Sequence, residues 1–239
     1  MRAAKPRTPA RRDVPVTRAR RSDGEATSKK LYAVALRLFR RKGFTETTMR
    51  DIAKAADLSL GAAYHYYPSK DAILQAYFGE QVGEHERLFA ERTSGIEDLR
   101  ERLQLAFDTG FETREKDRAL LGALAKVVLD RSSGASLFGE ASGEVRRRSI
   151  AIFARAVDVP SVNEDVKPLL ATSLWALHLG LLLYFVDDES PRSKQTKKLT
   201  SEVLDLVPPV ALFFGMPAMD GMRDKLGAAL RDAGVPLSG

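Results

Sequence analysis

Cysteine is absent from the 239-residue sequence. The chain therefore has no disulfide, no thiolate nucleophile and no sulfur ligand for zinc or an iron–sulfur cluster. Histidine is scarce as well, with His65, His85 and His178 as its three copies. His85-Glu86 is not followed by a second histidine four residues on, which the zinc-protease helix requires. We therefore expect no metal site and no cofactor.

Signatures of nucleotide chemistry and of acyl transfer are also missing. The sequence has no Walker loop, no glycine fingerprint of a dinucleotide-binding turn and no nucleophile elbow. Apolar and polar residues nowhere alternate for long enough to predict a sheet. We expect a protein that is not an enzyme and whose fold is all-α.

A secretory leader is not visible either, because the first residues contain no apolar stretch. With the lack of cysteine, this favours a cytoplasmic location. The most apolar segment, residues 169–186, has 18 residues and lies at the lower edge of the length for a membrane span. Because Thr172, Ser173 and His178 lie inside it, we interpret it as a buried helix and expect no membrane association.

Positive charge is concentrated at the N-terminus. Residues 1–30 contain ten Lys/Arg and three acids, a net charge of +7, which leaves −1 for the rest of the +6 total. A basic arm on a near-neutral body favours a polyanionic partner, with nucleic acid first. Because residues 1–25 are rich in Arg, Pro and Ala, we expect them to be disordered; the alternative is a solvated leader that binds nothing.

The next segment predicts a series of short helices. An apolar face at helical spacing begins after Ala26, and Gly43 supplies the left-handed residue that ends this first helix. A second helix over 47–56 starts at Thr47 or Thr48, with Asp51 completing a capping box. Ser59 caps a third helix over 59–66, and Ser69 caps a fourth.

Helices 47–56 and 59–66, joined by a short turn, form a helix-turn-helix, whose second helix enters the DNA major groove. Gly61 and its small neighbours allow close approach to base edges, while Ser59 and Leu60 project from the first turn toward a base, a phosphate or a thymine methyl. Tyr64 and His65 are placed to donate to phosphates, or are ordinary rim residues of a small bundle. We expect Tyr67 to pack inward and Lys70 to bind a phosphate at the start of the fourth helix.

The sequence TTMRDIAKAADLSLGAAYHYYPSKDAILQAYF resembles the DNA-binding domain of TetR-family transcriptional regulators over residues 26–78. Its Thr-Met-Arg-Asp-Ile-Ala, Ser-x-Gly, Tyr-His-Tyr-Tyr and Ser-Lys-Asp elements occur in the family's order and spacing. The resemblance implies a homodimeric, ligand-responsive regulator, usually a repressor. It also implies DNA contacts from Thr47 or Thr48, Arg50, Ser59, Gly61, Tyr64, His65 and Lys70.

The sequence departs from the family pattern at three places. Asp57 occupies the turn position where the family usually has Gly, and we expect the turn to survive because Asp tolerates the left-handed conformation. The Arg-rich arm is longer than usual and is predicted to reach the minor groove or to add salt-dependent affinity. Pro208-Pro209 predicts a kink or break late in the chain.

The predicted domains are an arm over 1–25, a DNA-binding domain over 26–72 and a helical ligand-binding and dimerisation domain over 73–239. The resemblance implies an effector pocket in the middle helices, which we expect to take a small apolar or amphipathic molecule. The alternative is that the candidate residues are simply core. The candidates are Phe107, Phe111, Leu124, Phe153, Trp175, His178 and Tyr184.

A dimer interface is implied for two late helices. Each has an apolar stripe at spacings of three to four, and two such stripes with their symmetry mates form a four-helix interface; alternatively, they close the core of one subunit. The first stripe is Leu174, Leu177, Leu181 and Phe185, and the second is Leu199, Val203, Leu206 and Val210.

The sequence thus predicts a dimeric regulator that binds a near-palindromic, double-stranded operator and responds to an effector. Two alternatives stay open. One is an architectural DNA-binding protein of the same fold without an effector, and the other is a helical lipid-binding or carrier protein whose helix-turn-helix is incidental.

Overall fold

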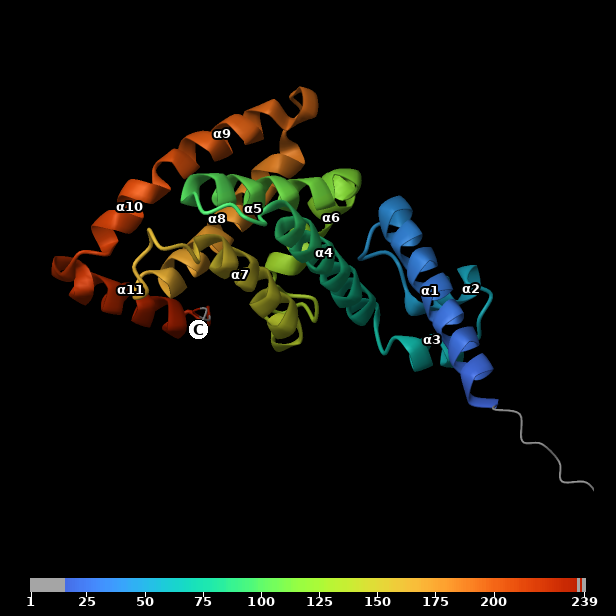
Figure 1. Ribbon diagram of the computed structural model, residues 1–239. Coiled ribbons are helices and arrows are strands. Elements are labelled where there is room, and N and C mark those ends of the chain that lie inside the picture. The colour runs from blue at the N-terminus through green and yellow to red at the C-terminus, as the bar shows by residue number, and fades with distance from the viewer. Residues whose placement is uncertain (1–15, 236, 238–239) are drawn as a thin grey trace, which may run out of the picture.

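The computed structural model describes residues 16–235 and 237, and the fold of these residues is all-α, as predicted. Figure 1 shows α1–α3 at one end of the molecule, α9–α11 at the other and α4 leading from the first group toward the second. The α-helices are α1 Val16–Lys42, α2 Met49–Ala55, α3 Leu60–Tyr66, α4 Lys70–Arg92, α5 Leu99–Arg114, α6 Arg118–Leu129, α7 Gly143–Val157, α8 Lys167–Asp187, α9 Lys194–Asp205, α10 Val207–Phe214 and α11 Asp220–Asp232. Short 3₁₀ turns lie between them at η1 Glu115–Asp117, η2 Glu140–Ser142, η3 Pro191–Ser193 and η4 Pro217–Met219.

The first helix is longer than the sequence pattern predicts. It begins at Val16, so the predicted boundary of the arm at residue 25 is wrong, and 16–25 extend α1. The boundary was argued from low apolar content, which reports on burial and not on helicity. Ala and Arg are good helix formers, and each residue added to an existing helix gains one backbone hydrogen bond. Residues 1–15 of the predicted arm lie outside the described residues.

The end of α1 follows the predicted capping chemistry. Gly43 has φ +89° and donates its N–H to the carbonyl of Phe39. Phe44 then turns back, and its ring lies 5.0 Å from the ring of Phe39. The chain can therefore reverse direction into α2 while it keeps both rings buried.

The smaller core joins α1–α3 to two later helices. It contains the apolar faces of α1 and α2 and Ala63 of α3, with Ile73, Leu74 and Tyr77 from the start of α4. Leu120 and Leu124 of α6 belong to the same cluster. The predicted division at residue 72 is therefore not a boundary between cores, because α4 and α6 contribute to this one.

The larger core lies between α4, α5, α7 and α8, with contributions from α9 and α10. Helix α8 is long and apolar enough to cross a membrane, but half of its most apolar window is buried inside the protein. Its residues Leu174, Trp175 and Phe185 are among those packed into this core. This placement agrees with the interpretation of the segment as a buried helix.

The double proline separates two helices, as predicted. Helix α9 ends at Asp205, and α10 begins at Val207 with the prolines in its first turn. Proline is tolerated there because the first N–H groups of a helix have no intrahelical acceptor. Figure 1 shows α10 following α9, and α11 running back beneath them.

Candidate nucleic-acid interface

Helix α2 starts with a complete capping box. The N–H of Asp51 donates to the hydroxyl of Thr48 at 3.1 Å, and the N–H of Thr48 donates to the Asp51 carboxylate at 3.0 Å. Lys42 of α1 donates to the same carboxylate at 2.9 Å. The Lys42 and Thr48 hydrogen bonds lower the pKa of Asp51 to about 2. These contacts fix the first helix of the pair against the end of α1.

The turn between the two helices keeps its form with an aspartate in the glycine position. Asp57 has φ +58°, in the left-handed region, as predicted. The N–H of Asp57 donates to the carbonyl of Lys54, and the N–H of Leu58 to that of Ala53 at 2.9 Å. This is the Schellman pattern, which usually has Gly at this position.

Helix α3 presents one face to solvent and one to the core. Ser59 caps it by accepting from the N–H of Ala62 at 3.1 Å. Ala63 is fully buried, whereas Leu60 and Tyr64 are 37% and 48% exposed. Ser59, Gly61 and His65 are also exposed. The predicted base-facing and phosphate-facing residues of α3 therefore share one accessible surface.

Packing within the subunit does not require a glycine at position 61. A Cβ built on it meets no atom within 4 Å, and its φ is not in the left-handed region. A larger side chain would therefore fit the isolated protein. The absence of a side chain matters only to something that approaches α3 from outside, such as the floor of a DNA groove.

An open hollow of about 450 Å³ lies beside α3, between the two helices of the pair. Its lining residues are Arg50, Ala53, Lys54, Asp57, Leu58, Ser59 and Leu60. Arg50 and Lys54 are exposed and form no ion pair with another described residue. Two free cations beside the reading helix suit the phosphates that flank a major groove. Lys54 was not among the predicted contacts, although its spacing of one turn from Arg50 places the two on one helix face.

Two predicted DNA contacts are placed differently. Thr47 is fully buried, and its hydroxyl donates to the carbonyl of Gly43 at 2.6 Å, so Thr48 is the threonine at the surface. The Lys70 ammonium donates to the carbonyls of Phe44, Thr45 and Thr47 at 2.8, 3.1 and 3.2 Å. All three of its N–H groups are thereby used, and Lys70 holds the turn before α2 against α4 rather than offering a free cation to phosphate.

The predicted effector residues divide into a cluster and two outliers. The rings of Phe107, Phe111 and Phe153 lie 5.3–5.7 Å from that of His178 in the larger core, and Trp175 is buried in the same core. Leu124 instead packs in the smaller core. Tyr184 is 43% exposed and donates to Gln195. The last two residues therefore lie apart from this cluster.

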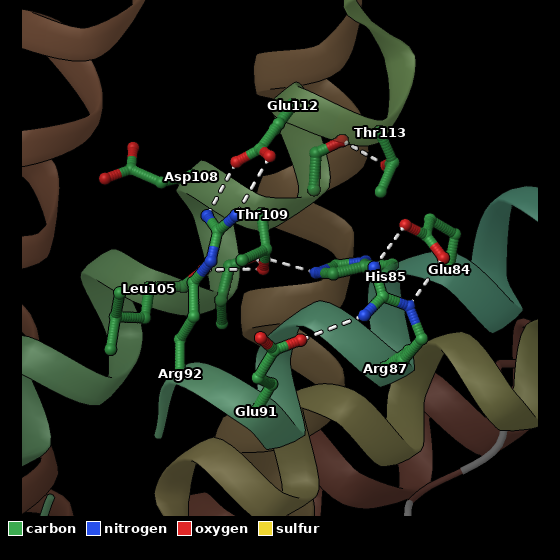
Figure 2. Close-up of polar contacts among 12 residues, drawn as sticks. Glu84, His85, Arg87, Glu91, Arg92, Leu105, Asp108, Thr109, Glu112 and Thr113 are labelled. Carbon is green, nitrogen blue, oxygen red and sulfur yellow. Dashed lines mark hydrogen bonds and ion pairs between the residues drawn. The ribbon is translucent and has the colours of Figure 1, made fainter. Parts of the chain in front are cut away.

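The buried polar groups of this cluster were only partly predicted. Neither ring nitrogen of His178 has a hydrogen-bond partner among the described residues. His85 of α4 reaches across to α5, where Nε2 lies 2.8 Å from the carbonyl of Ala106 (Figure 2). Arg114 of α5 is buried near both rings. Its position one heptad after Phe107 indicated an inward side chain, a signal the sequence reasoning did not use.

The predicted dimer residues also divide. Leu174, Leu181 and Phe185 are buried in the subunit's own core, and Leu177 packs against it, so the α8 stripe is wrong as an interface. In the second stripe Leu199, Leu206 and Val210 are 37%, 63% and 47% exposed. The solvent-facing side of α8 is the opposite one, with Ser173, Ala176, Gly180, Leu183 and Tyr184.

Comparison with known proteins covers both parts of the chain. Residues 31–77 match the family model of bacterial regulatory proteins of the tetR family, and residues 102–210 match that of the tetracyclin repressor-like C-terminal domain. The HTH-type transcriptional repressor KstR2 of Rhodococcus jostii (strain RHA1) is 27% identical over 147 residues, which cover 59% of this chain and 70% of that protein.

Solved structures have the same fold. The fatty acid degradation regulator FadR from Bacillus halodurans aligns with a TM-score of 0.59 and 17% identity, over 74% of this chain and 94% of that one. A tetR-family transcriptional regulator from Streptomyces coelicolor aligns with a TM-score of 0.56 and 20% identity, over 85% of this chain and 89% of that one.

Proposed function

Since the chain belongs to the TetR family of bacterial regulatory proteins, we propose that this DNA-binding transcriptional regulator is a homodimeric repressor that a small amphipathic molecule releases from DNA. The operator is near-palindromic, because a two-fold dimer presents the same helix twice. The family is one of regulators and not of enzymes. The protein acts on DNA in the cytoplasm.

The observation that supports direct DNA reading most strongly is the open surface of α3 around Gly61. Ser59, Leu60 and Tyr64 are exposed around Gly61, which has no side chain although the subunit leaves room for one. The helix stands at the end of the molecule, away from α9–α11 (Figure 1). A duplex can therefore approach it without contacting the larger part of the chain.

The homodimer is supported by the solvent-facing sides of two neighbouring helices. On α8 the small residues Ser173, Ala176 and Gly180 lie at spacings of three and four, followed by the exposed Leu183. Small side chains allow two helices to approach closely. The exposed apolar residues of α9 and α10 extend this face. Tyr184 of α8 donates to Gln195 of α9 and so connects the two helices.

The effector response is supported by the position of α6. Leu120 and Leu124 pack in the smaller core with α1–α3, the DNA-reading end of the chain, while Arg118 at the start of α6 donates to the carbonyl of Phe185 on α8 at 2.6 Å. A molecule that displaces α8 therefore acts on a helix that packs in the smaller core. This link favours effector-controlled spacing of the two reading helices over an architectural role without an effector.

The test of DNA reading is Gly61→Ala. The protein has room for the added methyl group, so the free energy of unfolding should not fall. Affinity for the operator, identified by gel shift on DNA near the protein's own gene, should fall about tenfold, because the methyl group holds the helix away from base edges. Gly79→Ala in α4 is the matched control, since a Cβ there also meets open space. Equal operator affinity for both variants, or no preference over random duplex at physiological salt, would contradict the proposal.

The test of the dimer is Leu183→Glu on the exposed side of α8. The charge should convert the dimer into monomers in analytical ultracentrifugation and weaken operator binding at the same time. Leu129→Glu, at a similarly exposed leucine on α6, is the control and should stay dimeric. A dimeric Leu183→Glu protein would place the interface elsewhere.

A further inference from the structure

We propose that Arg114, together with His178, forms a buried site for the carboxylate of an amphipathic effector, whose apolar part lies among the surrounding phenylalanines. The inference rests on the proposed function as an effector-responsive regulator. It adds the chemical class of the effector and the residues that select it.

Arg114 is a buried cation without a counter-ion. Its side chain lies in the last turn of α5 with 8% of the residue exposed. Its hydrogen bonds both come from Nη1, to the carbonyl of Gly110 at 2.8 Å and the hydroxyl of Thr113 at 2.9 Å. No described carboxylate lies within ion-pair distance. Burial lowers the pKa of Arg114 to about 10, which still leaves it charged at neutral pH.

Other arginines nearby do have carboxylate partners. Arg92 donates to both oxygens of Glu112, and Arg87 to Glu84 and Glu91 (Figure 2). Those pairs lie at the surface, where they contribute little to stability. Arg114 is thus the buried guanidinium of this region that an external anion can neutralise, and a buried unpaired charge is costly to keep.

His178 brings unused hydrogen-bonding groups to the same place. Both of its ring nitrogens lack a partner among the described residues, although the side chain is 99% buried. His85 lies 5.6 Å away between ring centroids; its Nε2 donates to Ala106, so its remaining nitrogen is an acceptor and does not bind a carboxylate. A buried imidazole with no partner costs about 1–3 kcal/mol, which a ligand oxygen bound to its N–H would remove.

Gly110 brings the three side chains together. Its carbonyl accepts from Arg114, and a Cβ built on it would overlap Nε2 of His178 and lie 3.1 Å from Cε1 of His85. A residue without a side chain is therefore required for both rings to lie against this turn of α5. Gly110 therefore lies against all three side chains.

The surroundings of His178 suit an apolar chain. The rings of Phe107, Phe111 and Phe153 lie 5.3–5.7 Å from that of His178, and Phe185 stacks on Phe111 at 5.2 Å. A bound molecule replaces contacts among these rings with contacts to its own chain, so little hydrophobic burial is lost. Its carboxylate meanwhile gains the buried cation and the imidazole N–H.

Arg114 also stands next to a contact with the DNA-reading end. Residues Glu115–Asp117 follow it directly as η1, and the carboxylate of Asp117 accepts from Tyr77 of α4 and pairs with Arg40 of α1 at 2.7 Å. An anion that binds Arg114 therefore acts on the last turn of α5, which positions Asp117. This provides a physical route from the site to α1.

The test compares decanoate with decanol by isothermal titration on the full-length protein. Decanoate should bind about tenfold or more tightly than decanol, because only the former satisfies Arg114. Arg114→Met should abolish this preference, raise thermal stability by removing an unpaired buried charge, and leave operator binding intact. Arg92→Met, which removes a surface arginine on the neighbouring helix, is the control and should keep the preference.

Three results of these binding and stability measurements would overturn the site. The first is equal affinity of the wild-type protein for the acid and the alcohol. The second is an Arg114→Met protein that still prefers the acid, and the third is an Arg114→Met protein that is strongly destabilised because Arg114 is a structural residue. Operator release by decanoate is measured separately by fluorescence anisotropy. Binding without release supports the carboxylate site and refutes the proposed effector response, whereas release by decanol as effectively as by decanoate refutes the site and leaves the proposed function standing.

Discussion

Acid should destabilise this protein through its two buried imidazoles. Burial and the charge of Arg114 lower the pKa of His85 to about 3, and the same causes, together with His85 itself, hold that of His178 well below its usual value. Both rings are therefore neutral in the folded state at pH 5.5. In the unfolded chain each titrates near its ordinary pKa of about 6.5.

The direction of this pH dependence follows from the number of protons that the folded and unfolded states bind. The unfolded state binds more protons than the folded state below about pH 6.5, so the contribution to stability is fully present above that pH. It is lost as the pH falls from about 6.5 toward the folded-state pKa values. Between pH 7.5 and 5.5 each ring should lower the free energy of unfolding by roughly 1 kcal/mol, or roughly 2–3 kcal/mol for the two.

The measurement is urea denaturation followed by the fluorescence of Trp175, the single tryptophan, which is 2% exposed in the same core. His178→Phe keeps an aromatic ring among its phenylalanine neighbours and should lose roughly 1 kcal/mol less than the wild-type protein over this pH range. Contributions from all other groups are common to both proteins and cancel in the difference. His65→Gln, which replaces an exposed ring on α3, is the control and should lose as much as the wild-type protein. A His178→Phe protein with the wild-type pH dependence would refute the reasoning, because His178 would then be accessible to protons in the folded state.

Three further predictions follow from individual contacts. Gly110→Ala should lower the free energy of unfolding by about 1–3 kcal/mol, because the added Cβ overlaps His178, although Ala is a better helix former than Gly. Gly79→Ala should raise the free energy of unfolding by about 0.5–1 kcal/mol. Equal urea midpoints for the two variants would contradict the packing. Asp57→Gly should stabilise by about 0.5 kcal/mol, since Gly adopts φ +58° without strain; destabilisation in the same assay would mean that the carboxylate has a structural role. Asp117→Asn should cost about 1–2 kcal/mol and Arg40→Gln less, because Asp117 is the more buried partner and also accepts from Tyr77; the reverse order would refute this assignment.

The DNA-reading end was largely predictable because its signals are local. Thr48, Ser59 and Ser69 cap their helices as the sequence indicates, Asp57 adopts the left-handed turn, and Gly43 ends α1. Each of these features depends on a backbone conformation or hydrogen bond within four residues. The fate of the Lys70 ammonium was not predictable in this way, since its acceptors lie 23–26 residues away.

In the larger part of the chain, the spacing of apolar residues does not specify which face of a helix is buried. Helix α8 is apolar on every side, so its sequence contains two possible stripes, and spacing alone does not say which of them faces the core. Leu174 and Phe185 turned out to be inside, and Leu183 outside. Similarly, Leu124 is equally apolar whichever core receives it, and the choice depends on how α6 packs between α1 and α8.

The position of α6 also matters to anyone who exchanges modules between regulators. Leu120 and Leu124 fill the interior beneath α1, so a transplant cut at the start of α4 would leave its recipient with a gap where two leucines belong. A transplanted α1–α3 segment that recognises a new operator must either include its own α6 or be joined to a regulator whose α6 has matching leucines.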